Sequence, residues 1–295
     1  MTRAVMLDGF GGPEVLRLGE IEVAAPGAGQ IRVSVRYAGV GPTDLAIRAG
    51  HLQGVFPAGA GSVLGFEAAG VVESVGEGVR DVGAGDEVAV FLPRLGGYAG
   101  LVAADYWVRK PAGVSWADAA ALPASGEAAA RVLDQLNLGA GETLLLLGAA
   151  GSVGRIATQL AVARGATVVA AVRPADFAVV EQLGGVPVDY AKPYGERVDA
   201  VFDASGRTDL GAAITAAGGP ERVITLSDPR GPQLGVELSN VVPEGVPGAL
   251  RQVMDRLAAG DLALQPQTIA PLAGVAELHA RLESGDLRGK ALLEL

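Results

Sequence analysis

Between residues 142 and 173 the chain passes through a short apolar run, three regularly spaced glycines, a helical apolar pattern and a second apolar run. The first run, residues 144–147, is continuous and ends at a glycine, which is typical of a parallel strand buried on both faces. Apolar side chains then recur on one helix face up to Gly165, a residue type that commonly ends a helix. The second run, residues 167–172, completes a predicted strand–turn–helix–strand unit.

Gly148, Gly151 and Gly154 have the spacing of a phosphate-binding turn. Glycines let the backbone approach a pyrophosphate, and N–H groups at the positive end of a helix hold its charge. Because the chain has 44 glycines among 295 residues, the spacing alone is a weak signal, and a plain strand–turn–helix connection is the alternative. The position of the glycines between strand and helix favours a dinucleotide site.

Arg173 stands nineteen residues after Gly154, where an acidic residue would bind the ribose 2′-hydroxyl of NAD. A guanidinium instead attracts a 2′-phosphate and binds it through paired hydrogen bonds. The sequence therefore favours NADPH. Asp176 nearby weakens this prediction, and a solvated arginine at a strand end is the alternative.

Length and charge restrict the class of protein. A chain of 295 residues suits two domains, and its net charge of −10 argues against nucleic acid or anionic membrane as a partner. No apolar run reaches the roughly 20 residues needed to span a bilayer, and the first residues lack a signal-peptide core. We expect a cytoplasmic protein with a small-molecule substrate.

The chain has no cysteine and two histidines, His51 and His279. A zinc site of the usual His/Cys type cannot be assembled from these residues, so no metal site is expected. Redox chemistry would therefore depend on an organic cofactor.

The rest of the chain falls into two kinds of pattern. Residues 1–111 contain short alternating segments, among them residues 31–37 and 87–91, and predict a mostly β domain. From residue 115 to residue 226 strand and helix patterns alternate, which predicts an α/β domain with a doubly wound parallel sheet. Residues 228–248 are rich in proline and glycine and are interpreted as loop or edge structure.

Several segments, in this order and spacing, resemble the zinc-free quinone oxidoreductase (zeta-crystallin-like) branch of the medium-chain dehydrogenase/reductase superfamily. The matching segments are residues 38–50, 64–76, 82–90, 96–99, 121–126, 148–154 and 288–290. The resemblance implies a GroES-like β domain of residues 1–114, to which residues 249–295 return, and a Rossmann domain of residues 115–248. It also implies NADPH in the interdomain cleft, zinc-free hydride transfer to a quinone or an activated alkene, and a homodimer.

The resemblance also implies site residues. The pyrophosphate turn falls on Ala150, Gly151, Ser152, Val153 and Gly154. Contacts to the 2′-phosphate fall on Arg173 and Tyr190, and the nicotinamide side on Ser205, Gly206, Leu226 and Ser227.

The substrate loop departs from the family pattern. Gly41 replaces an asparagine usual in these reductases, Ala46 replaces a tyrosine that several carry near the substrate, and Phe66 replaces the histidine of the zinc-dependent relatives. The resemblance therefore supports the cofactor and leaves the substrate open.

Thr43 and His51 are the two catalytic candidates that remain near this loop. Thr43 is a hydrogen-bond donor, and His51 carries an imidazole, a type of side chain that can donate a proton in catalysis. A histidine in such a loop is more commonly a solvated surface residue without a catalytic role. Asp44 is expected to cap a helix over residues 45–49. Hydride addition to an α,β-unsaturated carbonyl gives an enolate, and solvent is also able to protonate it, so the chain need not supply a proton donor. Packing roles are expected for Tyr98, Tyr106 and His279.

Three functions remain open from the sequence. The first is an NADPH-dependent reductase of quinones or α,β-unsaturated carbonyls. The second is a natural-product tailoring enzyme with the same fold, suggested by the loss of polar side chains from the substrate loop at Gly41 and Ala46. The third is a sensor or structural protein that binds NADPH without turnover, because fold-level likeness does not determine activity.

Overall fold

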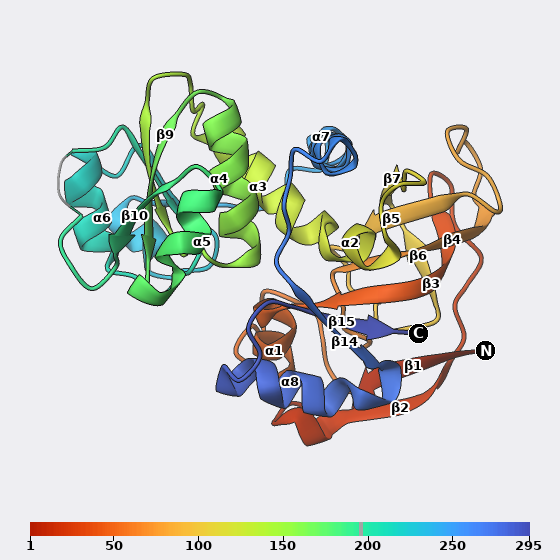
Figure 1. Cartoon of the computed structure of the whole chain (residues 1–295). Helices are drawn as coiled ribbons and strands as arrows, with labels where there is room; N and C mark the ends of the chain where they lie inside the picture. Colours follow the sequence, from red (N-terminus) through yellow and green to blue (C-terminus); the bar gives the residue numbers. More distant parts are fainter. Residues whose placement is uncertain (195–196) are drawn as a thin grey trace. The chain divides into compact units, whose positions relative to one another are not determined.

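The computed structural model describes residues 1–194 and 197–295 and divides into two compact units (Figure 1). The first unit comprises Met1–Ala124 and Pro266–Leu295, and the second comprises Ser125–Gln265. Along the described residues, no helix combines the length and the hydropathy needed to cross a membrane.

The units divide at other points than the expected domains, which were residues 1–114 with 249–295, and residues 115–248. Helix α2 (Trp116–Ala121) belongs to the first unit because its three buried alanines pack against strands there. Helix α7 (Val246–Ala259) belongs to the second unit, where the buried Val253 lies against Gly126 of α3 (Pro123–Gln135). The segment interpreted as loop, residues 228–248, therefore also contains the first turn of α7.

Strands and helices alternate along the second unit. Its strands are β8 (Thr143–Leu147), β9 (Thr167–Val172), β10 (Val186–Asp189), β11 (Ala200–Asp203), β12 (Val223–Thr225) and β13 (Glu237–Leu238). They form a parallel sheet in the order β10-β9-β8-β11-β12-β13. The four leucines of β8 are fully buried, as expected for a central strand covered on both faces. This sheet confirms the doubly wound arrangement predicted from the sequence.

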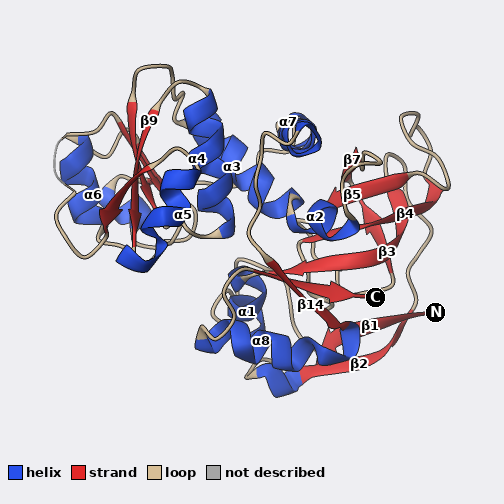
Figure 2. Cartoon of the chain, in the orientation of Figure 1, coloured by secondary structure: helices blue, strands red, loops and turns tan. Residues whose placement is uncertain are grey.

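Helices cover both faces of this sheet. The helices of this unit are α3 (Pro123–Gln135), α4 (Ser152–Ala163), α5 (Phe177–Gln182), α6 (Leu210–Ala217) and α7, together with the short 3-10 helices η2 (Pro174–Asp176) and η3 (Gly231–Leu234). Figure 2 shows α6 on one side of the strands and α4 and α5 on the other. Each of α4 and α5 connects two adjacent parallel strands, so both sit on the same face.

The turn between β8 and α4 requires glycine at two of its positions. Gly148 has a φ of +81°, a left-handed conformation that favours glycine. A Cβ on Gly154 would lie 2.6 Å from Ala149 Cα and closer still to Gly148 O. Only a residue without a side chain allows α4 to approach the turn this closely.

Strands dominate the first unit, as the sequence predicts. They are β1 (Thr2–Leu7), β2 (Leu16–Ile21), β3 (Ile31–Val40), β4 (Glu67–Val75), β5 (Glu87–Phe91), β6 (Leu101–Ala104), β7 (Tyr106–Arg109), β14 (Gln267–Pro271) and β15 (Lys290–Glu294). The larger sheet has the order β14-β15-β3-β4-β5-β7, with β6 also paired to β3, and β1 pairs with β2. Alternate residues of β3 are buried beginning at Ile31, so one face of this strand lines the core.

Short helices complete the first unit. They are α1 (Pro42–Arg48), α2 and α8 (Val275–Ser284), with the 3-10 helices η1 (Pro13–Val15) and η4 (Leu272–Gly274). Ser115 is the N-cap of α2, and its Oγ accepts a hydrogen bond from Asp118 N at 3.0 Å. Strand β15 lies between β14 and β3, so residues from both ends of the sequence share one sheet.

We expect Gly154→Ala to destabilise the protein by about 2 kcal/mol or more, because the added methyl group meets backbone atoms that cannot rotate away. Gly248→Ala is the matched control. Gly248 lies in α7 with open space around its Cβ position, so alanine there should stabilise by about 0.5 to 1 kcal/mol. Urea unfolding measures both variants, and equal effects would contradict the close-approach interpretation.

Candidate cofactor site

One edge of the parallel sheet gathers the residues expected to bind a cofactor. The glycine turn follows β8, Arg173 follows β9, and Tyr190 follows β10. Ser205 and Gly206 follow β11, and Leu226 and Ser227 follow β12. All of these loops leave the carboxyl ends of parallel strands. From β8 the strand order runs outward through β9 and β10 on one side and through β11, β12 and β13 on the other, so it changes direction between β8 and β11. This is where open α/β sheets bind ligands.

The first turn of α4 presents main-chain donors at this edge. Its N-cap residue is Gly151, which has no side chain to accept a hydrogen bond. Arg155 N donates to Gly151 O at 2.9 Å and begins the internal ladder of the helix. The N–H groups of Ser152, Val153 and Gly154 precede that ladder and suit an anion.

A glutamine that the sequence analysis did not single out contacts the same turn. Gln265 Nε2 donates to Ala150 O at 2.8 Å, and Ser152 Oγ lies 2.7 Å from Gln265 Oε1. Gln265 is distant in sequence from the glycines, and no local pattern marks it. Only the folded chain brings it to the turn.

Arg173 and Asp176 form an ion pair at the end of β9. Arg173 Nη2 lies 3.0 Å from Asp176 Oδ2, and Arg173 Nε donates to the same oxygen at 3.1 Å. The Arg173 side chain is 54% exposed, so its remaining N–H donors are accessible. Tyr190 is half exposed. The sequence therefore identified both the candidate guanidinium and the carboxylate that competes for it.

Arg155 adds a second guanidinium in the first turn of α4. Burial lowers its pKa, and the charge of Asp176 acts in the opposite direction. Its buried Nε atom has no hydrogen-bond partner within residues 1–194 and 197–295. Two arginines thus lie in the field of one carboxylate at the end of the sheet where a ribose phosphate is expected.

A buried carboxylate organises the loop after β11. Asp203 is fully buried, and its Oδ1 accepts from Ser205 Oγ at 2.8 Å and from Ser205 N and Gly206 N at 3.1 Å each. Thr208 Oγ1 donates to the same oxygen at 3.2 Å. Convergent donors of this kind satisfy a buried carboxylate and fix the loop that supplies them.

The same carboxylate reaches the loop after β12. Asp203 Oδ2 accepts from Thr225 Oγ1 at 2.9 Å, and Thr225 Oγ1 accepts in turn from Ser227 N at 3.3 Å. Gly206 has a φ of +62°, and its Cβ position is occupied by Ser227 Oγ. The two loops expected beside the nicotinamide are therefore held together by Asp203 and Thr225, which the sequence analysis did not assign.

The catalytic candidates lie in the first unit. Thr43 belongs to α1 and His51 follows that helix, and both side chains are exposed. Helix α1 begins at Pro42 with Gly41 as its N-cap, so Asp44 does not precede the helix as expected. Asp44 occupies the third helical position, where its Oδ2 accepts from Gly41 N at 2.8 Å. Asp44 Oδ1 also accepts from Gly65 N at 3.0 Å, and burial raises the pKa of Asp44 to about 7.

A buried ion pair also lies in the first unit. Lys290 of β15 forms an ion pair with Glu67 of β4, and both side chains are buried. Glu67 Oε2 also accepts from Ala124 N at 2.8 Å. A buried charge needs such partners, because an unpaired one is strongly destabilising. Within the described part of the chain, no group of three or more His, Cys, Asp or Glu residues is placed to hold a metal ion.

His279 and Tyr98 lie together in the core of the first unit. His279 Nε2 is 3.1 Å from Tyr98 Oη, and both residues are fully buried. Burial lowers the pKa of His279 to about 3, with a smaller contribution from the charge of Arg48. These contacts agree with the packing roles expected for His279 and Tyr98.

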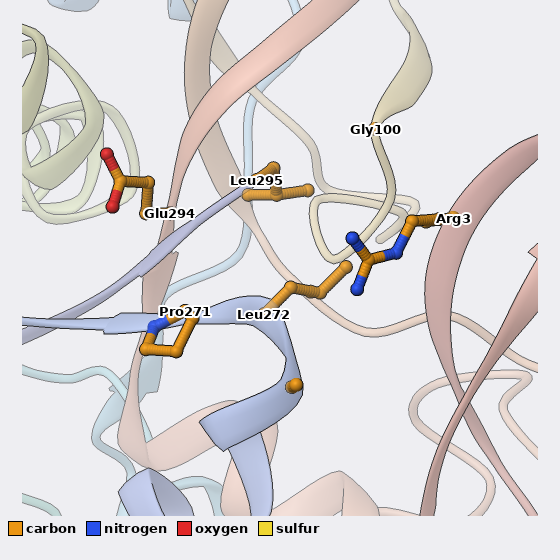
Figure 3. A pocket seen from close by; sticks show the side chains of 7 residues that line it. Arg3, Gly100, Pro271, Leu272, Glu294 and Leu295 are labelled. Carbon is orange, nitrogen blue, oxygen red and sulfur yellow. The ribbon is translucent and has the colours of Figure 1, made fainter.

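Figure 3 shows a hollow elsewhere on the first unit. Its lining is mostly aliphatic and includes Arg3, Leu272 and Leu295. None of the expected cofactor or catalytic residues contributes to it. We therefore do not assign a function to this hollow.

Comparisons with known proteins agree with this architecture. Residues 27–123 match the family model of the alcohol dehydrogenase GroES-like domain. A quinone oxidoreductase of Pseudomonas aeruginosa is 30% identical over 304 residues, which cover 98% of this chain and 90% of that protein. An NADPH-dependent alkenal/one oxidoreductase of Arabidopsis chloroplasts is 29% identical and covers 99% of this chain, with 79% of its own length aligned. The crystal structure of a quinone oxidoreductase of Pseudomonas syringae pv. tomato DC3000 has a TM-score of 0.86 at 26% identity and covers 100% of both chains.

We expect the His279→Gln variant to lose less free energy of unfolding on acidification than the parent protein does. The folded-state pKa of His279, about 3, lies below the ordinary value of 6.5, so between these pH values the unfolded chain binds the extra proton. The free energy of unfolding therefore falls as the pH drops through this window. By about pH 4.5 the His279 contribution should reach about 2 to 3 kcal/mol.

His51→Gln is the matched control, because His51 is the other histidine of the chain and is exposed. Urea unfolding of both variants and the parent, near neutral pH and near pH 4.5, gives the comparison. A pH dependence in His279→Gln equal to that of the parent would contradict a neutral, buried imidazole.

Proposed function

Because the chain belongs to the quinone oxidoreductase branch of the medium-chain dehydrogenase/reductase superfamily, we propose that it is an NADPH-dependent, zinc-independent reductase of quinones or α,β-unsaturated carbonyls. The observation that carries this proposal is the carboxyl edge of the parallel sheet. There the glycine turn, Arg173 and the loops after β11 and β12 occur together. The names of the relatives, quinone oxidoreductase and alkenal/one oxidoreductase, motivate the substrate class.

The residues at this edge fit a dinucleotide. The main-chain donors of Ser152, Val153 and Gly154 suit the pyrophosphate. Arg173 keeps accessible donors for a 2′-phosphate, even though Asp176 occupies two of its N–H groups. A phosphate would compete with Asp176 for the guanidinium, so the preference for NADPH depends on which anion Arg173 holds more strongly.

Bound NADPH supplies the hydride from its nicotinamide ring. The protein's part is to hold that ring and the substrate in position and to exclude water. Asp203 contributes by fixing Ser205 and Gly206, and Thr225 contributes by fixing Ser227. Thr43 is the proposed hydrogen-bond donor to the substrate oxygen and His51 the proposed proton donor, with solvent as the alternative source.

Zinc independence is proposed from the residues themselves. The chain has no cysteine, and its histidines are the buried His279 and the exposed His51. Phe66 stands where the zinc-dependent relatives carry a ligand. The homodimer and the cytoplasmic location expected from the sequence stay predictions.

A second candidate function follows from the substrate loop. Gly41 is the N-cap of α1 and Ala46 lies within that helix, so the side chains at both positions offer no polar group to a substrate. This absence of polar side chains motivates the second candidate, a natural-product tailoring enzyme with an unusual substrate. Tight NADPH binding without oxidation of a broad substrate panel would instead favour a sensor.

We expect purified protein to oxidise NADPH faster in the presence of 1,4-naphthoquinone or a simple enone than in their absence. Loss of NADPH absorbance follows the reaction, and product analysis confirms the reduced ring or alkene. Denatured protein and protein treated with a chelator are the controls, and the chelator should leave the rate unchanged. NADPH that binds and stays reduced with both substrates contradicts the general reductase, and a rate abolished by chelation contradicts zinc independence.

Arg173→Glu should weaken NADPH binding by about 1 to 3 kcal/mol and change NADH binding little, because only NADPH carries the 2′-phosphate. Arg164→Glu is the matched control, since Arg164 is the C-cap of α4, at the other end of this helix from the glycine turn, and pairs with Asp134. Fluorescence titration with each nucleotide measures the dissociation constants. Equal losses for NADPH and NADH would show that Arg173 does not select the cofactor.

A further inference from the structure

Hydrogen bonds of two glutamine side chains, Gln159 and Gln265, connect the segment after α7 to α4 and to the turn before it. Gln159 Nε2 donates to Ala263 O at 2.9 Å, and Ala263 N donates to Gln159 Oε1 at 2.7 Å. Two residues later Gln265 makes the second attachment, to Ser152 and to Ala150 O. The first attachment holds the second turn of α4, whereas the second holds the glycine turn itself.

The orientation of the Gln265 amide follows from its partners. Ala150 O can only accept a hydrogen bond, so the NH₂ group of Gln265 faces it. Gln265 Oε1 therefore faces Ser152, and the Ser152 hydroxyl must be the donor in that contact. Its single proton is committed to Gln265.

A pyrophosphate offers only acceptor oxygens, and a serine hydroxyl has one proton to donate. The Ser152 hydroxyl cannot serve Gln265 and a pyrophosphate together. We propose that the Gln265 side chain is an internal competitor for the pyrophosphate turn, which lowers cofactor affinity and is displaced from Ser152 when the cofactor binds. The inference rests on the proposed function, because it needs a dinucleotide at this turn.

Displacement of the Gln265 side chain affects only part of the segment after α7. The two hydrogen bonds between Gln159 and Ala263 do not involve the turn, so they persist when Gln265 is released. The freed stretch therefore starts after Ala263 and includes Gln265, the last residue of the second unit. Occupancy of the glycine turn is thereby coupled to the freedom of the backbone where the chain passes into the first unit.

The test starts with Gln265→Ala. We expect this variant to bind NADPH about two- to tenfold more tightly than the parent, the range for one neutral hydrogen bond. Gln267→Ala is the matched control, because Gln267 lies two positions further along, bonds Asp118 and does not touch the turn. In a Ser152→Ala background, Gln265→Ala should no longer tighten binding, since the contested hydroxyl is absent.

A spectroscopic readout separates competition from a structural role. In the parent protein the side-chain amide signal of Gln265, identified by its loss in Gln265→Ala, should shift on addition of NADPH. The Gln159 side-chain amide should keep its position and serves as the internal control.

The outcomes distinguish this inference from the proposed function. Tighter binding by Gln265→Ala with a shifted Gln265 signal supports it. Weaker or unchanged NADPH affinity, or a Gln265 signal that stays in place when NADPH is bound, overturns the inference and leaves the cofactor assignment intact. Failure of the parent protein to bind NADPH or NADH overturns both.

Discussion

The second unit depends on a contact between main-chain atoms of α4 and the turn that precedes it. Gly154 lies so close to Gly148 and Ala149 that no side chain fits between them. This approach brings the helix N-terminus next to the carboxyl end of β8, the central strand. The positive end of α4, the carboxyl end of the central strand and the spaced glycines therefore lie at one place. Each of these features alone is common in unrelated proteins, so their combination is what indicates a binding site.

Side-chain hydrogen bonds extend that arrangement across the sheet edge. Asp203 ties the loop after β11 to Thr225 on the neighbouring strand, and Gln265 ties the turn after β8 to a distant segment. Asp203 is fully buried and Gln265 is partly buried, so the hydrogen-bond partners of Asp203 in particular must be correctly placed for its carboxylate to be tolerated. The edge is thus shaped mainly by residues that need not touch a cofactor.

The sequence predicted those parts of the structure that are encoded locally. Continuous apolar strands and the glycine after a helix, Gly165, leave short-range patterns in the sequence, and these predictions are confirmed. Strands β1, β2, β6, β7 and β14 were not predicted, because they are short or half exposed and obtain their stability from partners far along the chain. Arg173 was proposed as a cofactor residue because its distance from the glycines carries information. Asp203, Thr225 and Gln265 follow no such spacing, since their partners are fixed by folding.

The ion pair between Glu67 and Lys290 has a consequence for the order of folding. The second unit is continuous in sequence, whereas the first is interrupted by it and is completed by β14 and β15. During synthesis, the edge of β3 that receives β15 and the carboxylate of Glu67 lack their partners until residues 290–294 leave the ribosome. For that interval the first unit has an open sheet edge, the kind of surface on which partly folded chains associate, while the residues of the second unit have all been made.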